Sequence, residues 1–193
     1  TGLFAELVCS NSLKSDSPET AHGLLKAELR RLGSLILRCA DESKVPAGSA
    51  LAVDRDVFAQ KVTDAVAGHP LIEVVRAELQ ALPTERPAII ATGPLTSSAM
   101  AKALFALTDE KYLFFYDAIS PIVAADSIDR DIVFMQSRYG KGEDDYINCP
   151  MDQAQYEAFY EALIGAEISL HADVDPKELF EGCLPVEVIA KRG

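Results

Sequence analysis

The stretch that decides the expected fold class reads Ala88-Ile89-Ile90-Ala91-Thr92-Gly93-Pro94. Its first four residues are apolar, which is typical of a buried strand, and the Thr-Gly-Pro sequence ends that strand in a turn. We predict a helix directly after the turn, from about residue 97 to residue 107. Glycine has no Cβ, so such a turn lets a nucleotide approach the backbone at a sheet crevice. An ordinary glycine turn explains the same residues equally well.

Two helices and a strand are predicted upstream of this stretch. The first helix begins with Ser17 as its N-cap and Pro18 at its first position, and the second begins after Asp54. Residues 72–75 form a further predicted strand. Helix, strand, strand, glycine turn and helix in this order predict an α/β domain with a buried sheet. The predicted buried faces comprise Leu24, Leu25, Leu29, Leu32 and Ile36 in the first helix and Phe58, Val62 and Val66 in the second.

The second part of the chain has a different character. One amphipathic helix is predicted at residues 152–166, after a group of short strands. Strands grouped before a helix indicate a mixed α+β subdomain, so we expect domains at residues 1–117 and 118–193. The predicted strands are residues 112–116, 132–136 and 146–149, and the predicted inward face of the helix comprises Tyr156, Phe159, Tyr160 and Leu163.

The composition predicts a soluble globular protein: of 193 residues, 49% are hydrophobic and 25% are charged. No stretch approaches the roughly 20 apolar residues that span a bilayer. The net charge of −12 argues against a general nucleic-acid binder, although it leaves room for a local basic face such as Arg138 with Lys141. The four cysteines form no C-x-x-C pair and the three histidines are scattered. We therefore predict no metal site and expect free thiols in a reducing cytoplasm.

Two cysteines are candidates for chemistry. Cys9 lies in Val8-Cys9-Ser10-Asn11-Ser12, where nearby donors can stabilise a thiolate, although a small buried side chain at a strand end fits the same pattern. Cys183 lies between a glycine and a proline, which favours an exposed turn and hence access to a substrate. Cys39 and Cys149 are interpreted as structural. Residues alone thus predict an α/β domain with two candidate thiols.

Several motifs together carry a more specific resemblance. The most distinctive are Phe4-Ala5-Glu6-Leu7-Val8-Cys9-Ser10-Asn11-Ser12 and Tyr146-Ile147-Asn148-Cys149-Pro150-Met151. The others are Val45-Pro46-Ala47-Gly48, Ala50-Leu51-Ala52-Val53-Asp54-Arg55, Ile90-Ala91-Thr92-Gly93-Pro94-Leu95-Thr96, Tyr116-Asp117-Ala118, Ser137-Arg138-Tyr139-Gly140-Lys141-Gly142 and Leu184-Pro185-Val186-Glu187-Val188. In this order, and over essentially the whole chain, they resemble the folate-dependent tRNA uracil-5-methyltransferases, flavoproteins of the TrmFO family.

The resemblance implies a fold and a reaction. The fold is part of a Rossmann-like FAD-binding domain, followed by part of a mixed α+β insertion subdomain. FAD is reduced by NAD(P)H, takes a one-carbon unit from methylenetetrahydrofolate, and the unit passes to C5 of the T-loop uridine of tRNA, giving ribothymidine. Cys183 corresponds to the family's nucleophile, which adds to C6 of the uracil. Cys9 corresponds to a cysteine beside the flavin, which assists removal of the C5 proton or protects the reacting flavin.

The resemblance also implies binding residues. The expected flavin-binding residues are Thr92, Gly93, Ser10, Asn11 and Arg55. Arg138 and Lys141 are candidates for contact with folate or tRNA phosphate, although a solvated surface explains these charges as well. Membrane contact is not expected, and the oligomeric state is not predicted.

One departure from the family pattern indicates a fragment, and two alternatives to the main interpretation stay open. The G-x-G-x-x-G loop that holds a dinucleotide is absent from the chain, so we expect an internal fragment that by itself holds FAD weakly or not at all and is inactive. The first alternative is the related GidA or MnmG flavoprotein family, which modifies the anticodon wobble uridine and shares the Ala-Thr-Gly turn. The second is a non-catalytic remnant that binds tRNA or another partner.

Overall fold

The computed structural model describes residues 2–8, 10–93, 96–108, 123–140, 142–167 and 186–192, apart from the side chains of Arg138 and Glu187. Contacts within the chain group it into two compact units. The first unit joins Thr1–Val74 to Ile119–Met151, and the second joins Val75–Ala118 to Asp152–Gly193. This grouping differs from the predicted domain boundary between residues 117 and 118. That boundary falls outside the described residues and stays a prediction.

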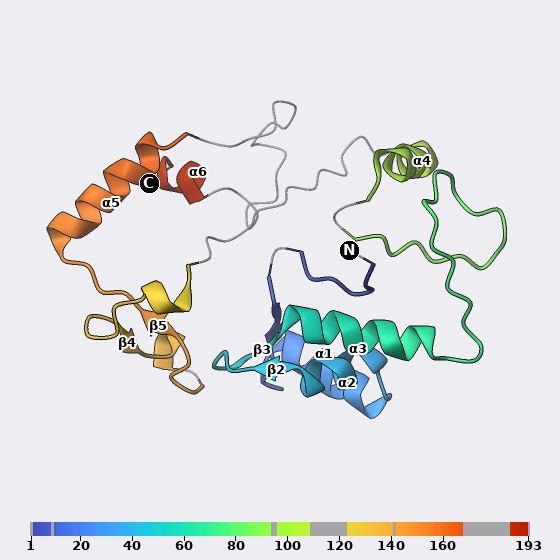
Figure 1. The fold of residues 1–193 in the computed structure, drawn as a ribbon, viewed down its shortest axis with the longest axis horizontal. Helices are drawn as coiled ribbons and strands as arrows, with labels where there is room; N and C mark the ends of the chain where they lie inside the picture. Colours follow the sequence, from blue (N-terminus) through green and yellow to red (C-terminus); the bar gives the residue numbers. More distant parts are fainter. Residues whose placement is uncertain are drawn as a thin grey trace. The chain divides into compact units, whose positions relative to one another are not determined.

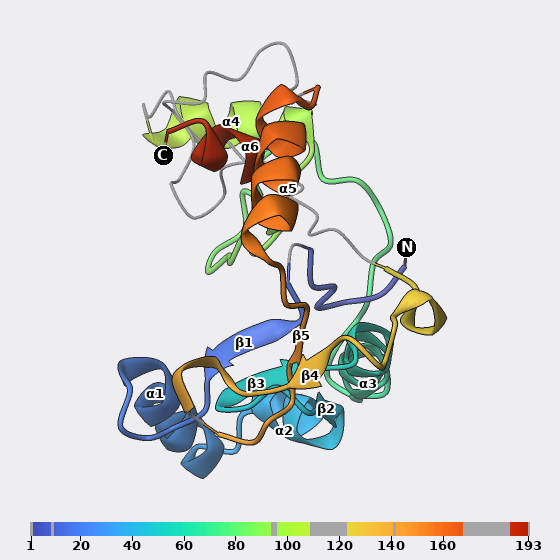
Figure 2. The ribbon, with the colours of Figure 1, turned by 90° about the vertical axis from the view of Figure 1, so that its left-hand side faces the viewer.

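The first unit contains a small antiparallel sheet, seen in Figures 1 and 2. Its strands are β1 (Ser12–Ser15), β2 (Lys44–Val45) and β3 (Ala50–Val53), in the order β1-β3-β2. Ser12 pairs with Ala52 and Ser15 with Ala50, while Lys44 pairs with Val53. The central strand β3 reads Ala-Leu-Ala-Val, and its last three residues are buried. Leu51 and Val53 belong to the hydrophobic cluster formed with α2 and α3.

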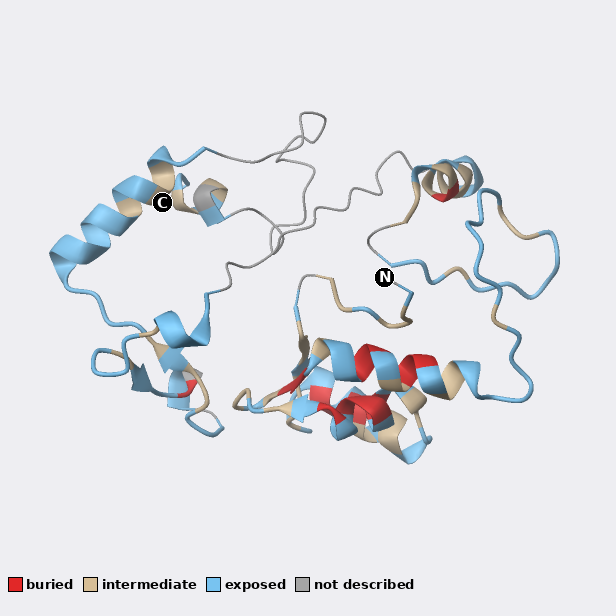
Figure 3. Ribbon diagram, in the orientation of Figure 1, coloured by how far each residue is buried: buried red, intermediate tan, exposed pale blue. Residues whose placement is uncertain are grey.

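Three helices complete this part of the first unit: α1 (Ala21–Arg31), α2 (Leu35–Glu42) and α3 (Arg55–Ala67). Figure 3 shows that the buried residues gather on α2, α3 and the adjoining strand. These buried side chains form one hydrophobic cluster, in which α2 and α3 pack together against β3. Its members are Leu37, Cys39, Ala40, Leu51, Val53, Phe58 and Val62.

Helix α3 confirms the sequence prediction. Asp54 is its N-cap, and the carboxylate accepts hydrogen bonds from the backbone N–H groups of Asp56 and Val57. The helix ends at Gly68. Phe58 and Val62 are almost fully buried, at 1% and 3% exposure, as their spacing predicted.

The prediction for the first helix was wrong in its start and in most of its buried face, although Leu29 packs against the hydrophobic core as predicted. The helix begins after Thr20, whose hydroxyl accepts a hydrogen bond from Gly23 N at 3.1 Å. Ser17 lies in a turn before the helix. Gly33, at φ +72°, separates α1 from α2, so the leucine pattern is divided between two helices. Consequently Leu24 and Leu32 are 51% and 81% exposed.

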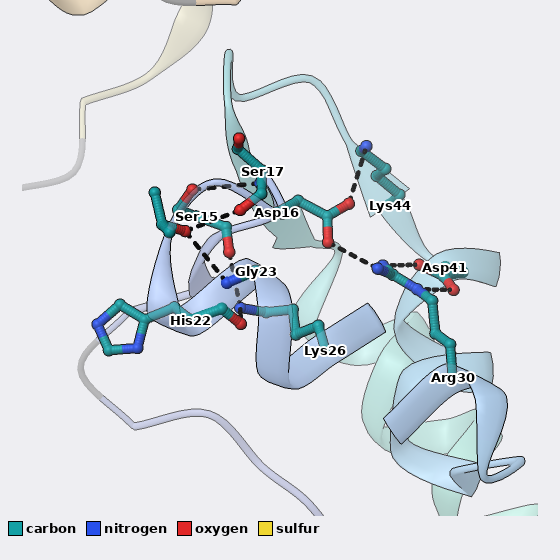
Figure 4. A network of polar contacts seen from close by, with 10 residues as sticks. Ser15, Asp16, Ser17, His22, Gly23, Lys26, Arg30, Asp41 and Lys44 are labelled. Carbon is teal, nitrogen blue, oxygen red and sulfur yellow. Dashed lines mark hydrogen bonds and ion pairs between the residues drawn. The ribbon is translucent and has the colours of Figure 1, made fainter. Parts of the chain in front are cut away.

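A polar network joins α1 to its surroundings instead (Figure 4). Lys26 is buried, and its Nζ donates to Ser15 O at 2.8 Å and His22 O at 3.2 Å. Burial away from water lowers the pKa of Lys26. Arg30 forms ion pairs with Asp16 at 2.9 Å and Asp41 at 2.6 Å. Its hydrogen bonds lower the pKa of the Asp41 carboxyl. The network ties α1 to α2 and to the segment after β1.

The strands predicted at residues 72–75 and 88–91 are absent from the described structure. Ile72 is 44% exposed and Ile89 is 92% exposed. A strand exists only where a neighbouring strand supplies hydrogen bonds, and none of the strands in the described ranges pairs with either segment. The described residues therefore form a mixed α/β structure with small sheets, and the larger buried sheet that the apolar run suggested is not found among them.

A second, two-stranded sheet belongs to the first unit. Strands β4 (Phe134–Met135) and β5 (Ile147–Asn148) are antiparallel, with Phe134 opposite Asn148. They lie within the predicted strands at residues 132–136 and 146–149, which are confirmed in position although the observed strands are shorter. Two short 3-10 helices, η1 (Ala125–Ser127) and η2 (Arg138–Gly140), flank β4 in the sequence.

The second unit contains the helices α4 (Ser98–Thr108), α5 (Gln153–Gly165) and α6 (Val186–Ala190). The limits of α4 and α5 agree with prediction within about one residue, and Asp152 caps α5 in a capping box with Gln155. The predicted inward face of α5 was wrong for Tyr156 and Phe159, which are 56% and 53% exposed. The strand predicted at residues 112–116 lies outside the described residues. None of the described helices is long and apolar enough to cross a membrane.

Candidate functional site

The segment that contains Cys9 is anchored on both sides to the first unit. Cys9 itself lies outside the described residues. After it, Asn11 Nδ2 donates to Val53 O at 3.0 Å, and Val53 N donates back to Asn11 O at 3.0 Å. Before it, Arg55 Nη1 donates to Val8 O at 3.5 Å. The structure thus brings Asn11 and Arg55 together at the end of β3, where both hold the backbone that flanks the candidate cysteine.

Two further contacts fix the same segment. Phe4 N donates to the Thr63 hydroxyl at 2.8 Å, and that hydroxyl donates to Ala59 O at 2.7 Å inside α3. Ser10 is exposed, and its hydroxyl accepts from Ser12 N at 3.0 Å. Sequence reasoning missed Thr63, because a threonine on the buried face of a helix resembles an ordinary core residue. The predicted site residues Ser10 and Asn11 therefore have a clear role in shaping the segment.

The Thr92-Gly93 turn is exposed and belongs to the second unit. Thr92 Oγ1 lies 2.6 Å from Thr96 Oγ1, which donates to Gly93 O at 2.8 Å. Gly93 has φ +72°, and a Cβ placed on it would meet nothing within 4 Å. The turn thus has open space beside its backbone. The structure does not group this pair with Ser10, Asn11 and Arg55, which belong to the first unit.

Two loops far apart in the sequence are joined within the first unit. Gly48 N donates to Asp145 Oδ2 at 2.8 Å, and Tyr146 Oη donates to Ala47 O at 3.0 Å. Sequence reasoning singled out the motifs that contain these residues, but it gave no indication that they meet. Two glycines, Gly48 and Gly142, were the available signal, since glycine is favoured where two backbones approach closely.

The other predicted site residues are described only in part. Arg138 begins the short helix η2, but its side chain is outside the described residues, as are Lys141 and Cys183 altogether. Cys39 is buried in the core, as the structural interpretation predicted. Cys149, interpreted as structural because it precedes Pro150, is exposed. Among the described side chains, no group of three or more His, Cys, Asp or Glu residues is arranged to hold a metal ion.

Comparison with known proteins gives the family. The family model described as glucose inhibited division protein A matches residues 1–193, so the chain belongs to this family. Among similar proteins, the chain is 58% identical to one from Moorella thermoacetica and 60% identical to one from Rubrobacter xylanophilus, each over 193 residues. A third, from Pelotomaculum thermopropionicum, is 56% identical. All three are named methylenetetrahydrofolate–tRNA-(uracil-5-)-methyltransferase TrmFO.

The aligned region is the whole of this chain but only part of each relative. All of this chain is aligned, but it spans only 43–44% of the length of each of these three relatives.

Proposed function

We propose that this protein takes part in methylating the T-loop uridine of tRNA at C5, with methylenetetrahydrofolate as one-carbon donor and FAD as cofactor. The supporting observation is the identity of 54–60%, over the whole chain, to relatives whose names state the folate-dependent tRNA uracil-5-methyltransferase activity. In this proposal NAD(P)H is the reductant and the T-arm of tRNA is the partner. A cytoplasmic location follows from the tRNA substrate and is part of the same proposal.

The proposed architecture assigns one role to each part of the chain. Residues 1–117 contribute part of a Rossmann-like FAD-binding domain, and residues 118–193 contribute part of a mixed insertion subdomain. Support comes from the anchored Cys9 segment, since Asn11 and Arg55 keep the flanking backbone at one end of β3. A catalytic thiol needs such fixed flanks, because small errors in position cost large factors in rate.

We propose Thr92 and Gly93, in the second unit, as contacts of the flavin ring. Gly93 is exposed and has nothing within 4 Å of its missing Cβ, which leaves room for a planar ring against the backbone. Thr92 offers a hydroxyl beside it. Arg55, in the first unit, is a separate proposed flavin contact, since its guanidinium has donors beyond the one directed at Val8. When bound and reduced, FAD supplies the electrons that convert the transferred methylene group into a methyl group. These residues would hold and orient it.

Cys183 is the proposed nucleophile. Its thiolate forms a bond to C6 of the uracil, and the C5–C6 π electrons move toward C5 and the O4 carbonyl. C5 then forms a bond to the one-carbon unit as the bond between that unit and the nitrogen of its carrier breaks. C5 afterwards loses its proton, a step that Cys9 assists if it does not instead protect the reacting cofactor. The C5–C6 double bond re-forms as the Cys183 sulfur leaves, which restores the pyrimidine and the free thiolate.

The proposal is tested in a chimera in which these 193 residues replace the matching segment of the Moorella thermoacetica relative. Transfer RNA that carries 5-fluorouridine should form a stable covalent adduct, because fluorine at C5 blocks the loss of a proton. We expect Cys183→Ala to abolish this adduct. Cys149→Ala is the matched control, since Cys149 is an exposed cysteine, and we expect it to leave the adduct unchanged. An adduct of normal yield in the Cys183→Ala variant would contradict the assignment.

One observation favours a second candidate. The family description names glucose inhibited division protein A, which corresponds to the alternative that modifies the anticodon wobble uridine. The two activities act on different loops of tRNA. Digestion of tRNA treated with the chimera, followed by mass spectrometry, locates the new group in the T-arm fragment under the first proposal. A group in the anticodon fragment would favour the second candidate.

A further inference from the structure

The two-stranded sheet of β4 and β5 carries apolar side chains that are exposed to solvent. Met135 lies opposite Ile147 in the register, so both side chains project from one face of the sheet, here called the Met135–Ile147 face. They are 49% and 38% exposed, and Phe134, on the opposite face, is 46% exposed. Figure 3 shows that β4 is exposed along its length. Neither face of this sheet is therefore fully covered by the described residues.

The chain that leads into and out of the sheet is exposed as well. Ile132, two residues before β4, is 61% exposed, and Met151, three residues after β5, is 50% exposed. The hydrogen bond from Gly48 N to Asp145 attaches this stretch to the rest of the first unit. However, the hydrophobic cluster of that unit contains none of the described side chains of residues 123–151. The apolar residues of the stretch thus lie outside the core.

Such a sheet needs a covering surface. Two strands alone are only marginally stable in water, and stability comes from a further strand or from packing of the apolar face. Each of the two strands has one edge without a partner strand among the described residues. Neighbouring apolar side chains that remain exposed are typical of a surface that contacts other polypeptide. The Met135–Ile147 face therefore has the properties of a docking surface.

The charges around the sheet indicate which kind of molecule can cover it. Residues 123–151 include six acidic and three basic residues. Five of the acidic residues are exposed: Asp126, Asp129, Asp131, Glu143 and Asp144. Carboxylates repel the phosphates of a nucleic acid, and they also repel the same acidic surface on a second copy of the chain. A polypeptide segment with apolar and basic side chains is complementary to this surface.

We propose that the Met135–Ile147 face is an internal docking surface, covered by a segment of the same polypeptide in a protein of the relatives' full length. More than half of each of the three relatives lies outside the matched stretch, since the chain spans 43–44% of their length. The covering segment comes from that part. Its apolar side chains pack on Met135 and Ile147, and its Lys or Arg side chains face the surrounding carboxylates. This inference goes beyond the proposed function and does not depend on it.

The methionines of the chain provide a probe that needs no substitution. Met135 is 49% exposed, whereas Met100 is 2% exposed. Dilute hydrogen peroxide oxidises accessible methionine to the sulfoxide, and mass spectrometry of the peptides gives the rate at each site. In the 193-residue chain, Met135 should react at least tenfold faster than Met100. In the chimera, Met135 should react at least tenfold more slowly than in the 193-residue chain. A methionine-containing peptide added to both samples controls for the reactivity of the peroxide.

Other occupants of the face give different patterns of oxidation. A second copy would protect Met135 in the 193-residue chain as the protein concentration rises, and a nucleic acid would protect it only when tRNA is added. A rate at Met135 as low as that at Met100 in the 193-residue chain would mean that these residues themselves supply the cover. Equally fast oxidation in the chain and in the chimera would mean that no cover exists. Each of these four results would overturn the proposal.

Charge reversal tests the basic character of the covering segment. In the chimera, the double variant Asp131→Lys with Glu143→Lys places like charges against the cover, so Met135 should be oxidised at least threefold faster. The double variant Glu19→Lys with Glu28→Lys changes the net charge equally at two exposed residues outside the stretch. It should leave the rate at Met135 unchanged. Equal rates in the two double variants would contradict the stated chemistry of the occupant.

The docking surface and the proposed function can fail separately, because oxidation is measured without turnover. A chimera that protects Met135 but forms no ribothymidine would contradict the proposed function alone. A chimera that forms ribothymidine, while Met135 is oxidised as fast as in the 193-residue chain, would overturn the docking surface alone.

Discussion

The helices α3 and α5 have the same length of 13 residues and similar N-terminal caps, yet they differ in what covers their apolar residues. On α3, Phe58 and Val62 are buried between α2 and β3. On α5, Phe159 is 53% exposed, and none of its residues is buried. The comparison teaches that an apolar face predicts a helix reliably, but it does not say whether the same chain supplies the covering surface.

The difference in burial between the apolar side chains of α3 and α5 can be tested with a matched pair of phenylalanines. Phe58→Ala should lower the free energy of unfolding of the 193-residue chain by about 3–5 kcal/mol, because it leaves a cavity in the closed core. Phe159→Ala should change it by less than about 0.5 kcal/mol, since that side chain already contacts solvent. Urea unfolding followed by circular dichroism measures both. Equal losses would mean that α5 is packed as tightly as α3.

The closed packing of the first unit extends to its loops, and two glycines test this. Gly142→Ala should cost about 2–3 kcal/mol, because the new Cβ meets Gly48 and the residue has a positive φ. Gly140→Ala should cost only about 1 kcal/mol, since Gly140 shares the positive φ but has open space around it. Thermal unfolding of the two variants ranks them. The reverse order would contradict the close contact with Gly48.

The caps of the two helices sharpen the comparison further. Asp54→Ala removes the N-cap of α3 and should lower the free energy of unfolding by about 1 kcal/mol, because α3 unfolds together with the core. Asp152→Ala removes the cap and capping box of α5 and should instead increase local fraying. Hydrogen exchange in the first turn of α5 reports that fraying. A shift of the main unfolding transition by Asp152→Ala as large as that by Asp54→Ala would show that both helices belong to one cooperative core.

The smallest expected effect is electrostatic and depends on pH. Arg30 lowers the pKa of Asp41, so this pair stabilises the fold fully above the ordinary aspartate pKa of about 3.9. The contribution is lost as pH falls through the lowered pKa. Arg30→Met should cost about 0.5–1 kcal/mol at pH 7, because the pair is partly exposed. Below about pH 4, the difference in free energy of unfolding between Arg30→Met and the unchanged chain should become smaller. Arg31→Met, at an exposed neighbour, is the control.

Local signals in the sequence predicted the helices well. Asp54 and Gly68 mark the two ends of α3, and the spacing of Phe58 and Val62 identifies its buried face. The error in the first helix has a local cause as well, since Gly33 at φ +72° divides the leucine pattern. A helix depends mainly on residues within a few positions of each other, and these are visible in the sequence.

Features that depend on distant partners were not predictable in the same way. Residues 88–91 have the composition of a strand, but a strand needs a neighbour, and composition does not provide one. The hydrogen bond from Gly48 N to Asp145 joins residues 97 positions apart, and the glycines in the two loops indicate a close approach without identifying the partner. The anchors of the Cys9 segment at Asn11 and Arg55 became visible only in the structure. The two candidate thiols were identified from their sequence context, whereas the role of each rests on the family resemblance.

The most direct test of the account is the methylation reaction itself. The chimera, in which these 193 residues replace the matching segment of the Moorella thermoacetica relative, is incubated with methylenetetrahydrofolate, FAD, NAD(P)H and an unmodified tRNA transcript. The account predicts ribothymidine in the T-loop, at a rate within about tenfold of the unchanged relative, and its loss in Cys183→Ala. A chimera that binds FAD as the relative does, yet forms no ribothymidine while the relative does so in the same assay, would contradict the proposed function.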